Sequence, residues 1–251
     1  MDSNYLIERD TKYWEQIQEV IDDNNLSIKF ISENMNSFVM RRDSAQYLAY
    51  FEIFQQVKEL PGCFAEFGIF WGSGFFTWLN LLELFIPLDR GRLHLGFDDF
   101  SGYEREIEPF EENSVKYINK RRGGDFKSPA DAIKKLIEIK NSDNLVAGNE
   151  RAILYEGNIQ NIWNDFRKEN LGVRFSLVCI DFNLYKPTSF ILAKVAELIV
   201  KGGIIVLRGY GVKPWEGESK AVDEFLENCK YRFIMKNITY SNTPGAYLIK
   251  Q

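Results

Sequence analysis

Cysteine and histidine are scarce in this chain of 251 residues, which has three cysteines and one histidine. Cys63, Cys179 and Cys229 are odd in number and widely spaced, so they predict neither a disulfide framework nor a metal cluster. Two of them fall in apolar runs, where reduced thiols buried in a hydrophobic core are expected. The scarcity excludes the small disulfide-rich classes and predicts a cytoplasmic protein.

Long apolar runs and an excess of positive charge are also missing. The chain carries 31 Lys and Arg residues against 36 Asp and Glu residues, a net charge of −5, which gives no bulk attraction for nucleic acid or an anionic membrane. The longest apolar stretches have the length of strands, and residues 1–5 show no signal-peptide pattern. We therefore expect a small-molecule partner, without nucleic acid or membrane.

What the chain does contain is a regular alternation of apolar runs with amphipathic stretches, which predicts a parallel sheet covered by helices on both faces. The predicted strands are 63–68, 93–98, 151–155, 175–181, 202–208, 231–238 and 245–250. The predicted helices between them are 73–86, 129–140, 159–170, 187–200 and 218–229. The last two strands are joined by residues 241–245, too few for a helical crossover, so the last strand should be antiparallel. The fold class is a doubly wound, seven-stranded, mostly parallel α/β sheet.

Two regions stand outside this alternation. Helical patterns occur at 11–22 and 44–60, and the second ends at Pro61-Gly62, so residues 1–60 are predicted to be a helical extension and 61–251 the main domain. The extension is expected to cap the cofactor or a partner subunit, which leaves a homo-oligomer open. Residues 101–128, with the run 120–122 of Lys and Arg, predict either a solvated loop or a lid over the substrate.

The loop after the first predicted strand is the strongest functional signal. Its candidate cofactor residues are Glu66, Gly68, Gly72, Ser73 and Gly74. Glycine adopts positive φ and lets a ligand approach the main chain, so the pattern fits a nucleotide-like cofactor. A dinucleotide fingerprint would need glycine where Thr77 stands, which disfavours nicotinamide or flavin. S-adenosylmethionine (SAM) is the favoured cofactor, and an ordinary strand-to-helix turn is the alternative.

Polar residues also end the next predicted strands, where ligands of open α/β sheets bind. Asp98 and Asp99 follow the second strand, and a carboxylate there accepts hydrogen bonds from both ribose hydroxyls; Asp98 is the first choice. A turn or helix cap is the alternative for both. Asn158 follows the third strand and fits the adenine edge. Asp181 ends the fourth strand, so the pattern fits an adenosine ligand.

Four segments, 61–68, 96–102, 181–188 and 202–205, resemble the TylF-type macrocin O-methyltransferase family. The resemblance runs from about residue 38 to the C-terminus. Members of that family are class I SAM-dependent enzymes that methylate sugar hydroxyls. The resemblance thus implies a sugar O-methyltransferase, with a sugar nucleotide or a glycan precursor as acceptor. The alternatives are a catechol-type O-methyltransferase and a degenerate homologue that binds SAM or a partner without catalysis.

The same resemblance implies a magnesium site from which this chain departs. The family has Asp-x-Asp-x-Tyr after strand four and Asp-Asp-Tyr-Gly after strand five, and these acids hold the ion. Here Asp181 and Tyr185 match, but Asn183 replaces one acid, and Arg208 and Gly209 replace the pair. Magnesium needs several oxygen ligands, so the loss of these carboxylates and the gain of a fixed cation predict no catalytic metal.

Asp181, Arg208 and Tyr185 are the candidate catalytic residues. Methyl transfer is an in-line displacement in which the acceptor oxygen loses its proton, so Asp181 is the candidate base or orienting group. Arg208 is expected to pair with Asp181 or to bind an anionic acceptor, and a solvent-facing position is the alternative. Tyr185 contacts the acceptor or closes the turn.

Three aromatic side chains have competing interpretations. His94, the single histidine, lies in the second predicted strand, which favours a place in the core over a catalytic role. Trp71 in the glycine loop and Trp163 after the third strand either line the pocket for adenine and the sulfonium or pack in the core.

Overall fold

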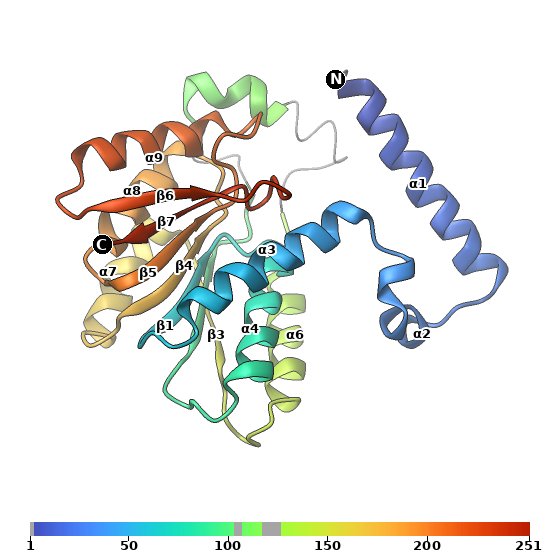
Figure 1. Cartoon of the computed structure of the whole chain (residues 1–251), viewed down its shortest axis with the longest axis horizontal. Coiled ribbons are helices and arrows are strands. Elements are labelled where there is room, and N and C mark those ends of the chain that lie inside the picture. The colour runs from blue at the N-terminus through green and yellow to red at the C-terminus, as the bar shows by residue number, and fades with distance from the viewer. Residues whose placement is uncertain (1–2, 103–106, 117–126) are drawn as a thin grey trace. The chain divides into compact units, whose positions relative to one another are not determined.

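The computed structural model describes residues 3–102, 107–116 and 127–251 (Figure 1). It forms two compact units, Met1–Ala45 and Gln46–Gln251. The predicted lid 101–128 is therefore described only in part, and its basic run 120–122 lies outside the described residues. Within the described residues, no helix has both the length and the apolar character needed to cross a membrane.

The first unit is helical. It contains α1 (Ser3–Asp23), α2 (Ile28–Glu33) and the beginning of α3 (Arg41–Val57), which continues into the second unit. The Tyr13 hydroxyl donates to the Phe38 carbonyl at 3.2 Å, and Arg42 pairs with Asp10. The predicted helix 11–22 lies within α1, whereas α2 was not predicted. The proposed division at residue 60 stays a prediction.

The second unit is built on one seven-stranded sheet with the strand order β3-β2-β1-β4-β5-β7-β6. The strands are β1 (Cys63–Phe67), β2 (His94–Asp98), β3 (Ala152–Glu156), β4 (Phe175–Ile180), β5 (Ile199–Leu207), β6 (Phe233–Asn237) and β7 (Ala246–Lys250). β7 runs antiparallel to both β5 and β6, and the other neighbours are parallel. The predicted doubly wound α/β sheet with an antiparallel last strand is confirmed.

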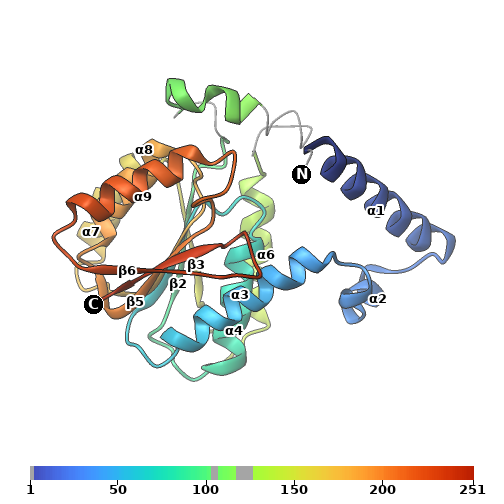
Figure 2. The same cartoon turned by 45° about the horizontal axis from the view of Figure 1, so that its top comes forward.

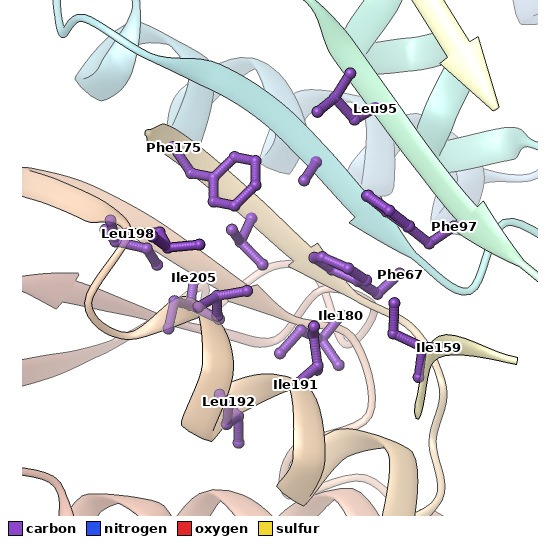
Figure 3. Close-up of a cluster of buried hydrophobic side chains, with 14 of the residues drawn as sticks. Phe67, Leu95, Phe97, Ile159, Phe175, Ile180, Ile191, Leu192, Leu198 and Ile205 are labelled. Atoms are coloured by element: carbon purple, nitrogen blue, oxygen red, sulfur yellow. The ribbon is translucent and has the colours of Figure 1, made fainter. Parts of the chain in front are cut away.

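Helices cover both faces of this sheet, as Figures 1 and 2 show. On one face lie the later part of α3, α4 (Ser73–Phe85) and α6 (Ala130–Ser142); on the other lie α7 (Ile159–Glu169), α8 (Tyr185–Val195) and α9 (Glu216–Asn228). Alternate residues of the strands therefore enter two cores. Figure 3 shows the core under α7 and α8, where Phe67 and Phe97 stack with ring centroids 4.6 Å apart.

Two predicted boundaries in the middle of the sheet are wrong. The helix predicted at 187–200 runs from Tyr185 to Val195, and β5 begins at Ile199 instead of residue 202. The prediction treated the glycine pair after residue 201 as the start of a strand. Gly202 instead lies inside β5 with a φ of +81°, where the pairing with β4 is irregular. The earlier start of α8 makes Tyr185 its first residue.

Gly96 of β2 lies where α4 and the loop after β1 pack closely against the sheet. A methyl group there would lie 2.5 Å from Ile69 Cδ1 and 2.7 Å from the ring of Phe75. We expect Gly96→Ala to lower the free energy of unfolding by ~1–3 kcal/mol through overpacking, measured by urea denaturation. Gly172→Ala is the control, since its methyl group meets nothing within 4 Å, and should change the stability by less than about 0.5 kcal/mol. Equal stabilities for the two variants would contradict this packing.

Candidate active site

A cavity of about 380 Å³ lies at the carboxyl ends of the strands. Its walls come from the segments at the carboxyl ends of four strands, with single residues from other elements. The lining residues of these segments are Gly68, Ile69, Phe70, Trp71 and Ser73 after β1, Phe97, Asp98, Asp99, Ser101 and Gly102 at the end of β2, Gly157, Asn158 and Ile159 after β3, and Asp181, Phe182, Asn183, Leu184 and Pro187 after β4. The strand order reverses between β1 and β4, and open α/β sheets bind ligands at such a point. The cavity is therefore where the sequence predicts a ligand.

The loop after β1 owes its shape to Asp98. Its Oδ2 accepts hydrogen bonds from the N–H groups of Ile69 at 2.6 Å and Phe70 at 2.8 Å, and its Oδ1 accepts one from Phe100 at 2.7 Å. Phe70 and Phe100 both have left-handed φ values, +54° and +57°, which are uncommon for bulky residues. The carboxylate of Asp98 thus holds two strained positions in place.

Asp98 and Asp99, at the end of β2, accept hydrogen bonds from different partners. Both line the cavity. Asp98 already accepts three backbone hydrogen bonds, the turn-forming role that was the alternative to ribose binding. Asp99 Oδ1 accepts from the N–H and hydroxyl of Ser101, at 2.9 and 2.8 Å. Asp98, the first choice for ribose, therefore already serves the turn, and the ribose role predicted for these two acids stays a prediction.

The predicted cofactor residues divide into two sets. Those that line the cavity are Gly68, Ser73, Asp98, Asp99, Asn158 and Asp181. Glu66, Gly72 and Gly74 do not line it. Gly72 has a φ of +82° at the start of α4, and a Cβ at Gly74 would lie 2.7 Å from Glu66 Oε1. These two glycines shape the turn and let α4 approach the strand.

Gly68 and Asn158 have structural duties as well as a place in the cavity wall. Gly68 has a φ of +88°, and a Cβ there would lie 2.7 Å from the carbonyl oxygen of Asp181. Only glycine lets the ends of β1 and β4 come so close. Asn158 Oδ1 caps α7 by accepting from the N–H of Gln160 at 2.9 Å.

Glu66 lies in β1 beneath the first turn of α4 and is completely buried. Burial raises its pKa from the ordinary 4.5 to about 8, although the positive charge of Arg208 acts in the opposite direction. Glu66 is therefore protonated at neutral pH. It belongs to the interior beneath the site.

The end of the cavity next to β4 and β5 is organised by an ion pair. Arg208 Nη1 donates to Asp181 Oδ2 at 2.6 Å, and Asn183 Nδ2 donates to Asp181 Oδ1 at 3.1 Å. The side chains of Arg208 and Asp181 are only 13% and 16% exposed. Tyr50 of α3 covers the guanidinium, with 6.0 Å from its ring centroid to Arg208 Cζ. Of the expected roles of Arg208, the structure shows the pairing with Asp181.

These residues do not fit a magnesium ion. Both oxygens of Asp181 already accept hydrogen bonds, and one of the donors carries a permanent positive charge. Asn183, with a left-handed φ of +61°, directs its amide nitrogen at Asp181. In the described part of the chain, no group of three or more His, Cys, Asp or Glu residues could hold a metal.

The structure does not bring Tyr185 to the cavity. Its hydroxyl donates to Glu224 Oε2 of α9 at 2.6 Å, and its ring meets Phe110 edge to face. Its backbone N–H donates to Glu111 Oε1 at 2.9 Å. Of the two roles predicted for Tyr185, this geometry favours the structural one at the start of α8.

The three other aromatic candidates are clearly placed. Trp71 lines the cavity and is 49% exposed, whereas Trp163 packs in the core against Phe67 and Phe166. His94 is buried and stacks on Phe75, with ring centroids 4.2 Å apart. Burial lowers its pKa to about 3, so its ring is neutral, in agreement with a core role.

Several residues of the site were not predicted. Glu218 of α9 is buried, and its Oε1 accepts from the Gly209 N–H at 2.8 Å. Burial raises its pKa to about 8, with Asp181 adding to the rise. Gln46, Trp215 and Thr243 line the cavity. The only signal for Glu218 is an acid in the first turn of a helix, which is common and has no functional meaning by itself.

Comparison with known proteins finds no matching family model and no curated relative, whereas solved structures share the fold. The crystal structure of CalS11, a calicheamicin methyltransferase, aligns with a TM-score of 0.79 at 20% identity, over 96% of this chain and 92% of that chain. The fold is that of class I methyltransferases.

Two further solved structures share this fold. The apo structure of CalS11, described as a TDP-rhamnose 3'-O-methyltransferase, aligns with a TM-score of 0.73 at 21% identity, over 96% of this chain and 94% of that chain. The O-methyltransferase NovP aligns with a TM-score of 0.59 at 18% identity, over 82% and 80% of the two chains. At these identities the likeness establishes the fold.

The raised pKa of Glu66 makes the stability depend on pH. Between pH 4.5 and about 8, the folded state keeps a proton that the unfolded chain releases, so the free energy of unfolding falls as pH rises. One such group contributes ~1.4 kcal/mol per pH unit. Glu66→Gln should remove this contribution, and urea denaturation at several pH values from 5 to 8 measures it.

The exposed Glu227 of α9 provides the control. Glu227→Gln leaves both Glu66 and Glu218 in place. Its free energy of unfolding should therefore change with pH as in the wild-type protein. If Glu66→Gln also kept that pH dependence, the raised pKa of Glu66 would be refuted.

Proposed function

We propose that this protein is a SAM-dependent O-methyltransferase that acts on a hydroxyl group of a sugar. The observation that carries the proposal is the cavity at the reversal point of the sheet, which brings together six of the predicted cofactor residues. The structural likeness to CalS11, described as a TDP-rhamnose 3'-O-methyltransferase, supports a sugar nucleotide as acceptor. The resemblance to the TylF-type family supports the same acceptor class and stays a prediction.

In this proposal, SAM binds along the β1, β2 and β3 side of the cavity. The loop 68–73 supplies main-chain groups and the face of Trp71, and aromatic faces attract cations such as a sulfonium. Asp99 is the proposed ribose partner, with Asn158 at the adenine. SAM supplies the methyl group, and the protein supplies position and charge.

The acceptor hydroxyl is proposed to bind beside Asp181. A carboxylate that receives two hydrogen bonds from Arg208 and Asn183 is held rigidly, so it orients the hydroxyl by accepting its hydrogen bond. The same two donors stabilise the ionised form, which makes Asp181 a weak base, so it chiefly orients the hydroxyl and takes up its proton only as the new oxygen–methyl bond forms and the sulfonium leaves as a thioether. The charge that a metal would supply comes from Arg208. We therefore propose a metal-independent reaction. The scarcity of cysteine supports the cytoplasm as its place.

SAM binding and metal independence can be tested together. Isothermal titration should detect SAM binding with one site per chain. Methyl transfer to a panel of sugar nucleotides should be unaffected by EDTA, because in this proposal the charge of Arg208 beside Asp181 replaces that of a metal. A panel of catechols tests the small-molecule alternative. Absence of binding heat excludes the cofactor, and loss of turnover in EDTA excludes the metal-free mechanism. Binding without transfer to either panel would identify the degenerate homologue.

Asp181→Asn tests the proposed orienting group. We expect kcat to fall by about 10²–10⁴-fold while the Kd for SAM changes by less than about threefold, since the amide cannot accept both hydrogen bonds. Asp223→Asn is the control, because this carboxylate accepts from Tyr210 on the surface of α9 and does not line the cavity. Thermal unfolding of both variants separates lost catalysis from lost structure. Near-normal turnover in Asp181→Asn would show that Asp181 does not orient the acceptor.

A further inference from the structure

Residues 107–116 dock onto the N-terminal ends of α8 and α9. They include the short 3-10 helix Pro109–Glu111, and residues 112–116 continue it as a helical turn, drawn in green in Figure 1. This segment is polar in sequence and follows β2 along the chain. Its attachment to α8 and α9 depends on one buried carboxylate, that of Glu111.

Glu111 is only 2% exposed, unlike most acids of a surface segment. Its Oε1 accepts from the N–H of Tyr185, the first residue of α8, at 2.9 Å. Its Oε2 accepts from the N–H of Glu108 at 2.9 Å, which closes a capping box within the segment. One side chain therefore fixes the segment internally and joins it to α8.

The beginning of α9 is shaped around the same carboxylate. A Cβ at Gly217 would lie 1.7 Å from Glu111 Oε1, so any side chain there would expel it. The positive ends of two helices meet at this point, which favours a negative charge. Glycine at position 217 and glutamate at position 111 thus depend on each other.

Further polar contacts surround this central contact. Lys186 of α8 pairs with Glu108 at 3.1 Å, and the Ser114 hydroxyl donates to Glu216 of α9 at 2.7 Å. Lys220 of α9 lies over the ring of Phe110, 4.7 Å from its centroid. These groups are more exposed than Glu111, so each contributes less than the buried carboxylate.

The apolar side of the segment reaches the cavity wall. Val115 is buried against Leu184, and Ile107 and Trp215 pack on this pair. Leu184 and Trp215 both line the cavity, at the end where Asp181 and Arg208 lie. The segment is therefore in direct contact with two residues of the cavity wall.

We propose that Glu111 is a positioning residue for the acceptor: by docking residues 107–116 on α8 and α9, it fixes Leu184 and Trp215 in the wall against which the sugar binds. This inference rests on the proposed function, because it takes the acceptor to bind at this end of the cavity. Glu111 touches neither the cavity nor the reacting atoms, so its effect passes through the two wall residues.

The experiment compares Glu111→Gln with Glu112→Gln in the full-length protein. The two substitutions remove the same charge from neighbouring positions, but Glu112 is exposed and, among the described residues, its side chain pairs with Lys116. In Glu111→Gln, one carboxylate oxygen becomes an amide nitrogen and can no longer accept a hydrogen bond. Hydrogen exchange at the amides of Tyr185 and Glu108, which donate to Glu111, then measures docking without any assay of activity.

We expect exchange at these two amides to become at least about tenfold faster in Glu111→Gln and to stay unchanged in Glu112→Gln. The KM for the sugar-nucleotide acceptor should rise about tenfold in Glu111→Gln while the Kd for SAM stays constant, because only the acceptor wall is disturbed. Gly217→Ala should reproduce the faster exchange at the Glu108 amide and the higher acceptor KM, since its methyl group expels the carboxylate while residue 111 is unchanged. The Tyr185 amide is not used in this variant, because the same methyl group would lie 2.7 Å from Tyr185 N.

Unchanged amide exchange in Glu111→Gln and Gly217→Ala would overturn the docking. Faster exchange with an unchanged acceptor KM would overturn the positioning role and leave Glu111 as a structural contact. An inactive wild-type protein would refute the proposed function and, with it, the acceptor role, while amide exchange would still decide whether Glu111 docks the segment.

Discussion

A permanent positive charge beneath the protein surface is the constraint on which the candidate site depends. The guanidinium of Arg208 does not lose its proton, and its side chain is 13% exposed, so a negative charge must lie beside it. Asp181 provides that charge at 2.6 Å, and Asn183 adopts a left-handed backbone conformation from which it binds the second oxygen. A single ion pair thus decides the conformation of the turn after β4.

The same pair explains the state of the other buried acids. One cation is neutralised by one anion, so Glu66 and Glu218 gain little from ionising, and burial raises the pKa of each to about 8. At neutral pH the interior beneath the cavity therefore holds one charge pair and two neutral carboxylic acids. Gly209 belongs to this arrangement, because a Cβ there would lie 2.6 Å from Asn183 Oδ1 and 2.8 Å from Glu218 Oε2.

Much of the fold could be predicted because each strand and helix has its own periodicity, and the short 241–245 connection requires an antiparallel last strand. The site could be predicted as a set of loops but not always as side chains. Spacing alone does not reveal that Gly74 accommodates Glu66 instead of a ligand. The sequence predicted Tyr185 in the site because the helix was expected to begin at residue 187. In the structure α8 begins at Tyr185, and the hydroxyl of this residue donates to Glu224. The docking role of Glu111 had no local signal, because its partner in α8 is 74 residues away and only its capping contact with Glu108 is local.

The position of the cavity between β1 and β4 has a consequence for the order of folding. These two strands pair although their residues are about 110 positions apart in sequence, and closing so long a loop is slow compared with forming local structure. Asp98 and the loop that it holds need only β1 and β2, whereas Asp181 and Arg208 come from β4 and β5. The cavity is therefore complete only when these distant parts of the chain have paired, and a ligand that touches both sides can bind only such a chain. Such a ligand would report the completed sheet, and by mass action it would favour that state over partly folded forms.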